Sequence, residues 1–437
     1  MSLQTLLTPW VSQWLLSPER LQRQRARAER QRRRRGAAHE ILYFHQVDDP
    51  YSALAAQSLP LLAQRYEVQI RPFLVPAPGD DVAPERERLE AYSRDDAQWL
   101  AAHHGLHFRD PGQPPSTRAV QHTAQQLLQA IIEGTFVDRA GALSRALWQS
   151  QDQDSTTPMP PAPRSAALSD HLQQAQRLRE RLGHYLGATF YCAGEWYWGI
   201  DRLHHLEQRL QALGATRQTP LLPTLLYPPA EDLRHDVAPQ TAQTLEFFFS
   251  FRSPYSAIVA ERVFELARHT GAQVQLRYVL PMVMRGLPVP QAKRRHIALD
   301  TAREARARGI AFGRLQDPVG RPTERGLALI TWAERHGRGQ AYVLAFMHGV
   351  WARGLDAGSE RGLRQIVEAA GLPWHEARQA LQDNTWRQIA ENNRQALLAM
   401  GLWGVPSFRV GHVAVWGQDR LARVQNALLP ATPEPPA

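Results

Sequence analysis

The strongest constraint on the fold is a pattern that occurs twice in the chain. Residues 43–53 read Tyr-Phe-His-Gln-Val-Asp-Asp-Pro-Tyr-Ser-Ala, and residues 247–257 read Phe-Phe-Phe-Ser-Phe-Arg-Ser-Pro-Tyr-Ser-Ala. In each copy, an apolar run typical of a buried strand precedes a Pro-Tyr-Ser-Ala segment that begins an amphipathic helix. Proline is favoured in the first turn of a helix because the N–H that it lacks would have no partner there. Both copies therefore predict a strand that leads directly into a helix.

Two further segments repeat in the same order. A second strand is predicted at residues 68–71 and at 274–277, and Trp-Gly-x-Asp-Arg-Leu occurs at 198–203 and 416–421. The alternating residues before each Trp-Gly predict a two-stranded ribbon, which a helix follows. Three matches in one order predict a tandem duplication, in which each half is built as β-α-β, a helical insertion and β-β-α. That order is typical of a thioredoxin-like domain, so we predict an α/β fold of two tandem domains.

The chain is long enough for more than one domain, with 437 residues. In the second half a mostly helical stretch is predicted from about residue 291 to 400, with breaks near 317–318 and 371–373. In the first half the corresponding stretch is interrupted by a Pro-rich surface loop at 155–163. The predicted parts are a basic amphipathic arm at 1–36, a first domain at 37–218, a Pro-rich linker at 219–244 and a second domain at 245–430.

Composition excludes several kinds of chemistry. Cys192 is the only cysteine, so no disulfide framework, thiolate zinc site, iron–sulfur cluster or two-cysteine redox pair can form within the chain. Lys293 is the only lysine, which argues against Schiff-base catalysis. The net charge is +9, but residues 19–35 hold nine arginines against two glutamates and account for +7 of it. The basic character therefore belongs to the arm.

The second half resembles a known superfamily in three separated motifs. Residues 248–256 resemble the active-site entry of the DsbA-like thioredoxin superfamily, whose oxidoreductases carry Cys-Pro-His-Cys where this chain has Ser253 and Ser256. The Ser-Pro-Tyr-Ser entry is similar to that of the branch of 2-hydroxychromene-2-carboxylate isomerases and kappa-class glutathione transferases. Residues 401–408 resemble that branch's Gly-Val-Pro loop, whose proline is cis, and residues 416–421 resemble its hairpin-to-helix signature. The resemblance implies DsbA-type thioredoxin-like domains.

The resemblance also implies a site for glutathione as co-substrate. Ser253 would be the catalytic residue that hydrogen-bonds the glutathione sulfur, since its hydroxyl and the N-terminus of the following helix can both stabilise a thiolate. The backbone of Val405, before a cis Pro406, would pair with the cysteinyl part of glutathione as an added strand does. Gln418 and Asp419 would hold the γ-glutamyl end. The alternative for Ser253 and Asp419 is that each only caps a helix.

The substrate side departs from the family pattern. Where the family has an Asn and a Pro after the second strand, this chain has Arg285-Gly286-Leu287-Pro288. Where a Tyr is common before the helical Asp-x-x-Arg, the chain has His296, followed by Asp300 and Arg303. Arg285 and His296 are therefore the candidates for contact with a small electrophilic substrate. The alternative for His296 is a structural histidine on a helix.

The first half lacks the features that would bind a thiol cofactor. Asp49 stands at the position of Ser253, where a carboxylate would repel a thiolate, and Ala188 stands at that of Pro406. We expect Cys192 to be a buried apolar residue. We assign no metal site to His103, His104 and His107 or to His204 and His205, because adjacent histidines on a helix should point apart and no matching pattern of acidic partners is visible. This half is predicted to be a degenerate domain that pairs with the second half as a pseudo-dimer within one chain.

The N-terminal arm leaves three alternatives open. Residues 1–16 place Leu, Trp and Val at spacings of three and four, and an Arg-rich stretch follows. The arm is a solvated helix or frayed extension with its apolar stripe docked on the body, an interfacial anchor on an anionic membrane through residues 1–35, or a nucleic-acid arm. We favour them in that order, with nucleic acid last. A secretory signal has its charges before the apolar region, so we expect a cytoplasmic protein that the arm can bring to a membrane.

These features lead to two functional hypotheses. The first is a glutathione-dependent isomerase or transferase-like enzyme that activates the thiolate with Ser253. The second is a non-catalytic thioredoxin-fold binding or scaffold protein that uses the cis-proline groove for a peptide. A thiol–disulfide oxidoreductase fits by ancestry alone, since the two-cysteine motif is missing.

Overall fold

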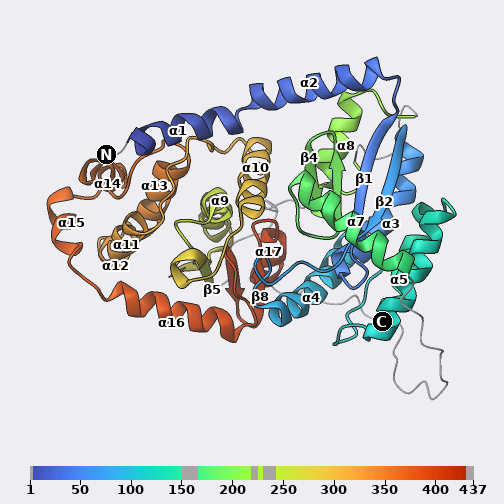
Figure 1. Ribbon diagram of the computed structural model, residues 1–437. Helices are drawn as coiled ribbons and strands as arrows, with labels where there is room; N and C mark the ends of the chain where they lie inside the picture. The colour runs from blue at the N-terminus through green and yellow to red at the C-terminus, as the bar shows by residue number, and fades with distance from the viewer. Residues whose placement is uncertain (1–2, 150–165, 218–224, 230–242, 430–437) are drawn as a thin grey trace. The chain divides into compact units, whose positions relative to one another are not determined.

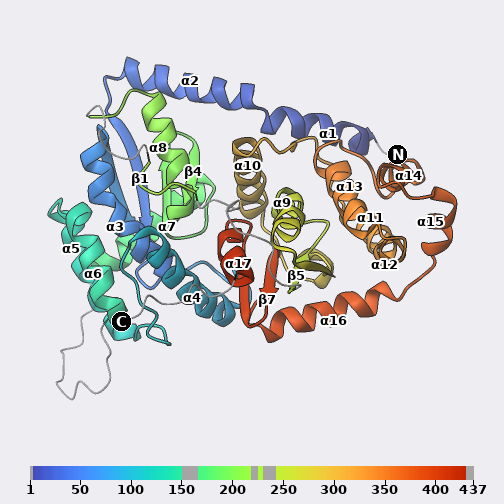
Figure 2. The same cartoon turned by 180° about the vertical axis from the view of Figure 1, so that it is seen from behind.

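The computed structural model describes residues 3–149, 166–217, 225–229 and 243–429. The predicted Pro-rich loop at 155–163 and most of the linker at 219–244 lie outside the described residues. The chain forms two compact units, which are described one at a time (Figure 1, Figure 2). The N-terminal unit comprises residues 22–229 and 290–296, and the C-terminal unit comprises residues 1–21, 230–289 and 297–437.

The C-terminal unit contains a four-stranded sheet in the order β6-β5-β7-β8. Its first two strands are parallel and joined by α9, and the other two form an antiparallel ribbon that leads into α17. This order confirms the predicted β-α-β unit and the closing ribbon and helix. The elements are β5 (Thr244–Phe249), α9 (Pro254–Thr270), β6 (Gln273–Tyr278), β7 (Ser407–Val410), β8 (Val413–Trp416) and α17 (Leu421–Leu428).

A helical insertion separates the two parts of this sheet, as the sequence predicts. The breaks expected at 317–318 and 371–373 fall between helices. In both views α11 and α13, drawn in orange, belong to a group of helices beside α9 (Figure 1, Figure 2). The insertion consists of η2 (Met282–Arg285), α10 (Gln291–Ala307), α11 (Arg321–Ala328), α12 (Ile330–Arg335), α13 (Gly339–Trp351), α14 (Glu360–Ala369), α15 (Trp374–Ala380) and α16 (Trp386–Ala399).

Strand alternation explains where the core of the C-terminal unit lies. Phe247 and Phe249 of β5 face the same side of the sheet, where their rings stack with centroids 5.1 Å apart. Phe247 also stacks on Phe408 of the neighbouring strand β7 at 5.6 Å. All three side chains are fully buried. The apolar run before the Pro-Tyr-Ser-Ala motif is therefore a central strand of the sheet.

The N-terminal unit contains a second four-stranded sheet with the corresponding order, β2-β1-β3-β4. Its first pair is parallel and its ribbon is antiparallel, as in the other sheet. Cys192 is buried, as the sequence predicts. The elements are β1 (His39–His45), α3 (Pro50–Arg65), β2 (Val68–Leu74), α4 (Arg86–His104), α5 (Thr117–Ile132), α6 (Phe136–Gln149), α7 (Ala166–Leu182), β3 (Thr189–Cys192), β4 (Glu195–Trp198), η1 (Ile200–Arg202) and α8 (Leu203–Ala212).

The arm forms two helices, α1 (Leu3–Leu16) and α2 (Pro18–Arg34). Ser12 of α1 accepts a hydrogen bond from the backbone N–H of Leu315 at 2.9 Å, so α1 docks on the C-terminal unit. Trp10 and Trp14, however, are 59% and 57% exposed. The expectation that a docked arm would bury its apolar stripe is therefore wrong, because α1 docks through its other face.

Candidate functional site

Ser253 caps helix α9 at the point where β5 ends. Its backbone is extended and Pro254 occupies the first helical position, as the motif predicts. The Ser253 hydroxyl accepts a hydrogen bond from the backbone N–H of Ser256 at 3.1 Å. The hydroxyl of Ser256 is itself buried and makes no hydrogen bond to the residues that the structure describes. Two serine hydroxyls thus stand at the N-terminus of α9, where the resemblance implies the two cysteines of the oxidoreductases.

The loop before β7 lies against Ser253. The peptide bond between Val405 and Pro406 is cis, which confirms the geometry that the resemblance implies. The Ser253 hydroxyl donates to the Val405 carbonyl at 3.2 Å, across 152 positions in sequence. The structure therefore brings together three of the predicted site residues. The backbone N–H of Val405 donates to no acceptor among the described residues.

Ion pairs hold the side chains next to Ser253. Arg252 makes two hydrogen bonds to the carboxylate of Asp317, at 2.7 and 2.8 Å. Tyr255 donates to buried Asp300 at 2.7 Å, and Arg303 pairs with the same carboxylate at 3.2 Å. The Asp-x-x-Arg motif thus orients the tyrosine of Pro-Tyr-Ser. The sequence analysis did not predict this role of Asp317, because it took Asp317-Pro318 only as a break between helices.

Gln418 and Asp419 follow β8, as predicted, but the side chain of Gln418 is occupied. Arg262 of α9 donates to its side-chain oxygen at 2.9 Å, and its amide nitrogen donates to Glu304 at 2.9 Å and to Asp419. Gln418 is only 2% exposed, whereas Asp419 is half-buried. The amide therefore ties the loop to α9 and α10, and a ligand role for either residue stays a prediction. Sequence reasoning missed Arg262.

The two candidates for the substrate side lie in different surroundings. Arg285 ends η2 in the C-terminal unit and is half-buried. His296 is grouped with the N-terminal unit, where its ring lies 4.4 Å from that of His184 and 6.3 Å from that of Tyr185. Contact of either residue with a substrate stays a prediction.

The N-terminal unit fills the equivalent position with its own side chains. Asp49 caps α3, and its carboxylate accepts from the backbone N–H and the hydroxyl of Ser52 at 2.9 and 2.7 Å. The Ser52 hydroxyl also accepts from the backbone N–H of Ala188 at 2.9 Å. Burial raises the pKa of Asp49 to about 6. In the C-terminal unit the Ser253 hydroxyl meets the carbonyl before cis Pro406, whereas here Asp49, Ser52 and Ala188 hydrogen-bond to one another.

Asp49→Asn tests this internal role through pH. The folded-state pKa of Asp49 (about 6) lies above the ordinary value of 3.8, so the folded protein holds this proton more tightly than the unfolded chain does. The stability that the protonated carboxyl contributes is therefore fully present below pH 3.8 and is lost as the pH rises through 6. Asparagine caps a helix equally well. The stability of Asp49→Asn relative to the wild type should therefore rise by about 2 kcal/mol between pH ~4 and neutrality.

The measurement is urea unfolding of both proteins at the two pH values. Asp80→Asn is the matched control, since its carboxylate is 84% exposed, and its relative stability should not depend on pH. An equal change for both variants would contradict the prediction.

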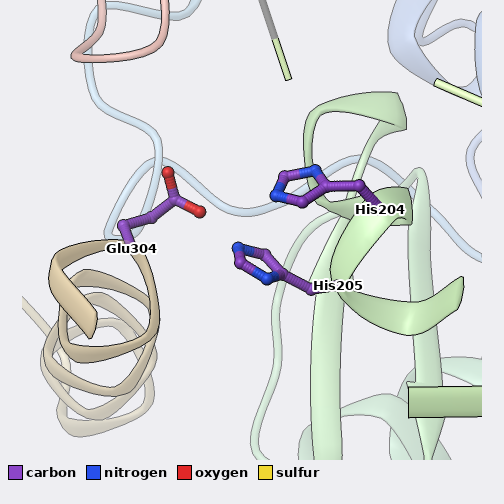
Figure 3. A group of neighbouring side chains, drawn as sticks. All are labelled: His204, His205 and Glu304. Carbon is purple, nitrogen blue, oxygen red and sulfur yellow. The ribbon is translucent and has the colours of Figure 1, made fainter. Parts of the chain in front are cut away.

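His204 and His205 lie in the first turn of α8, with both rings buried and their centroids 3.9 Å apart (Figure 3). The expectation that these adjacent histidines point apart is therefore wrong. Glu304, drawn with them, belongs to the C-terminal unit, where Arg308 pairs with its carboxylate at 2.7 Å. The expectation that the chain holds no metal stays a prediction.

Comparisons with known proteins concern the C-terminal half. The family model of the DsbA-like thioredoxin domain matches residues 244–429. The 2-hydroxychromene-2-carboxylate isomerase of Sphingobium xenophagum is 25% identical over 203 residues, which cover 43% of this chain and 98% of that protein. The corresponding isomerase of Pseudomonas putida is 22% identical over 192 residues, which cover 42% and 93%.

Solved structures match the same share of the chain. A 2-hydroxychromene-2-carboxylate isomerase structure is 22% identical with a TM-score of 0.37, and the match covers 42% of this chain and 94% of that one. The cytosolic disulfide reductase DsbM from Pseudomonas aeruginosa is 18% identical with a TM-score of 0.35, covering 42% and 95%. Together, the family match and the β-α-β, helical, β-β-α order show that the C-terminal half of this α/β protein contains a DsbA-like thioredoxin domain.

Proposed function

We propose that the DsbA-like domain is a glutathione-dependent isomerase or transferase that acts on a small electrophile. The observation that carries this proposal is the Ser253 hydroxyl, which lies between the N-terminus of α9 and the carbonyl before cis Pro406. The two relatives that match almost along their whole length are isomerases by name, which supports this class of reaction.

Ser253 is suited to stabilising a thiolate. A thiol with a pKa of about 8.5 is mostly protonated at neutral pH and reacts as the thiolate. The Ser256 N–H donates to the Ser253 oxygen, which leaves the hydroxyl proton able to turn from the Val405 carbonyl to a sulfur anion. The positive end of the α9 dipole favours the same anion. The enzyme then needs no cysteine of its own.

The cis-proline loop would hold the tripeptide. The backbone N–H and carbonyl of Val405 can pair with the cysteinyl residue of glutathione as one strand pairs with another. We assign the γ-glutamyl ammonium group to half-buried Asp419. Gln418, which Arg262 and Glu304 engage, would keep that carboxylate in place. Arg285 is the cation that we assign to an acidic group of the substrate.

The reaction would begin with addition of the thiolate to an electrophilic carbon of the substrate. The new C–S bond takes its electron pair from sulfur, and the thiol proton passes to solvent or to the adjacent carbanion. In an isomerase the C–S bond breaks after the rearrangement and glutathione is regenerated. In a transferase the thioether is the product, so one glutathione is consumed for each product molecule. The amount of glutathione consumed therefore distinguishes the two reactions.

Ser253→Ala is expected to remove thiolate stabilisation. Calorimetric titration of reduced glutathione into the wild type should show binding in the micromolar to low-millimolar range, with release of a proton at neutral pH. In Ser253→Ala the proton release should disappear. Ser359→Ala is the matched control, because Ser359 caps α14 through the N–H of Gly362 at 3.0 Å and both variants lose a cap worth about 1 kcal/mol.

The proposal fails if the wild type gives no heat up to about 10 mM glutathione, since even a Kd of ~1 mM corresponds to only about −4 kcal/mol. It fails equally if Ser253→Ala binds and releases protons like the wild type. A non-catalytic binding protein would then be the better hypothesis.

The common strand order of the two sheets supports the tandem duplication that we also propose, and pairing of the halves as a pseudo-dimer stays a prediction.

A further inference from the structure

Helix α1 is held on the rest of the C-terminal unit by the face that carries Pro9, Ser12 and Leu16. Ser12 accepts from the N–H of Leu315 at 2.9 Å, and the carbonyl of Leu16 accepts from Arg306 at 3.0 Å. Pro9 packs so closely against Gly354 that a Cβ added to this glycine would lie 2.6 Å from the proline ring. These contacts fix the rotation of α1 about its axis.

The opposite face of α1 is apolar and exposed. Its residues follow the spacing of three and four that places side chains on one side of a helix. We call them the α1 apolar face: Leu7, Trp10, Val11, Trp14 and Leu15, which are 43–59% exposed. They make up five of the nine large apolar side chains that are exposed in the described residues. Clustering of this kind marks a binding surface, whereas single exposed apolar residues are ordinary.

Two cations lie against the α1 apolar face, and the next helix in sequence carries more. The guanidinium of Arg314 lies 4.1 Å from the ring centre of Trp10, and that of Arg20 lies 4.2 Å from the ring centre of Trp14. Helix α2, which follows in sequence, has no buried residue. Its exposed arginines, with those just after its end, are Arg23, Arg27, Arg30, Arg33, Arg34 and Arg35.

We propose that residues 3–35 bind an anionic lipid surface, with the α1 apolar face in the headgroup layer and the α2 arginines on lipid phosphates. Two tryptophans beside arginines suit the interface, where an amphipathic ring meets apolar chains on one side and charge on the other. Among the helices that the structure describes, none is both long and apolar enough to cross a membrane.

Charge and apolarity together favour lipid over the other occupants. A nucleic acid would satisfy the arginines but leave the α1 apolar face in water. A second copy of the chain could cover that face but would bring two sets of arginines together, each with a net charge of +7. An anionic membrane satisfies both features. This inference does not depend on the proposed chemistry.

Sedimentation of the full chain with vesicles tests the proposal. Vesicles of phosphatidylcholine with about one third phosphatidylserine should bind it at least tenfold more tightly than phosphatidylcholine alone, and ~0.5 M salt should weaken the binding. Trp10→Ala/Trp14→Ala should weaken binding to the anionic vesicles by tenfold or more. Replacing Arg23, Arg27 and Arg30 with glutamine should cost about fivefold per arginine.

Ile132→Ala is the matched control, since Ile132 of α5 is 69% exposed outside the arm, and it should bind like the wild type. All variants change exposed residues, and their circular dichroism should match that of the wild type. The proposal is overturned if no vesicle binds, or if neutral and anionic vesicles bind equally. It is also overturned if light scattering shows a dimer that Trp10→Ala/Trp14→Ala dissociates, or if the arginine variants lose binding to RNA while vesicle binding is unchanged.

Discussion

Gly404→Ala is expected to destabilise the DsbA-like domain by about 1–3 kcal/mol and to abolish the glutathione binding that we propose. A Cβ at position 404 would lie 2.2 Å from Cζ2 of Trp416, closer than any non-bonded contact allows. The indole cannot move away easily, because it also packs on Trp403 with ring centroids 5.2 Å apart. The strain therefore passes to Val405, whose carbonyl accepts the Ser253 hydrogen bond. Urea unfolding and calorimetric titration measure the two effects.

A double-mutant cycle provides the control for Gly404→Ala. Trp416→Leu alone removes the packing on Trp403 and is itself destabilising, but it makes room for the alanine. The two changes should therefore cost less together than the sum of the separate costs, by about 1 kcal/mol or more. Additive effects would show that the ring is not the obstacle. Unchanged stability and binding in Gly404→Ala alone would contradict the close packing that the prediction assumes.

Arg262→Met is expected to lower the free energy of unfolding by about 2–4 kcal/mol. Arg262 is 8% exposed and donates to the side-chain oxygen of Gln418 at 2.9 Å and to its carbonyl at 3.3 Å. Methionine fills much of the same space but leaves both buried oxygens without their donor, at about 1–3 kcal/mol each. The loop that carries Asp419 should loosen as well, so glutathione should bind more weakly.

Arg268→Met is the matched control on the same helix. Arg268 is 72% exposed and pairs with Glu265 at 3.8 Å, so its loss should change stability by less than about 0.5 kcal/mol. Unfolding in urea distinguishes the two variants. An equally small loss for Arg262→Met would show that water replaces the guanidinium and that the network does not hold the loop.

The order of strands and helices could be predicted because it depends on local patterns. The apolar run 247–249 and Pro254 together specify a strand that leads into a helix, and Ser253 reaches the N–H of Ser256 only three positions away. Such contacts form between neighbours in sequence, whatever the rest of the chain does. The cis peptide at Pro406 followed from a resemblance in a short motif.

Partners that are distant in sequence could not be predicted from these patterns. Arg262 and Gln418 lie 156 positions apart, and nothing local to either residue indicates the other. The same limit applies to the pairing of Arg252 with Asp317, 65 positions away. Each such pair depends on how β5, α9 and the helical insertion pack, which is settled by all their contacts together.

The arm shows most clearly which features the sequence determines and which features only the tertiary structure decides. The sequence alone determined that residues 3–16 form an amphipathic helix with an apolar stripe, because a period of 3.6 residues places Trp10 and Trp14 on one side. It did not determine which side docks. The tertiary structure decided that, because Ser12 and Pro9 fit Leu315 and Gly354 more closely than bulky indoles can, and the stripe was left exposed.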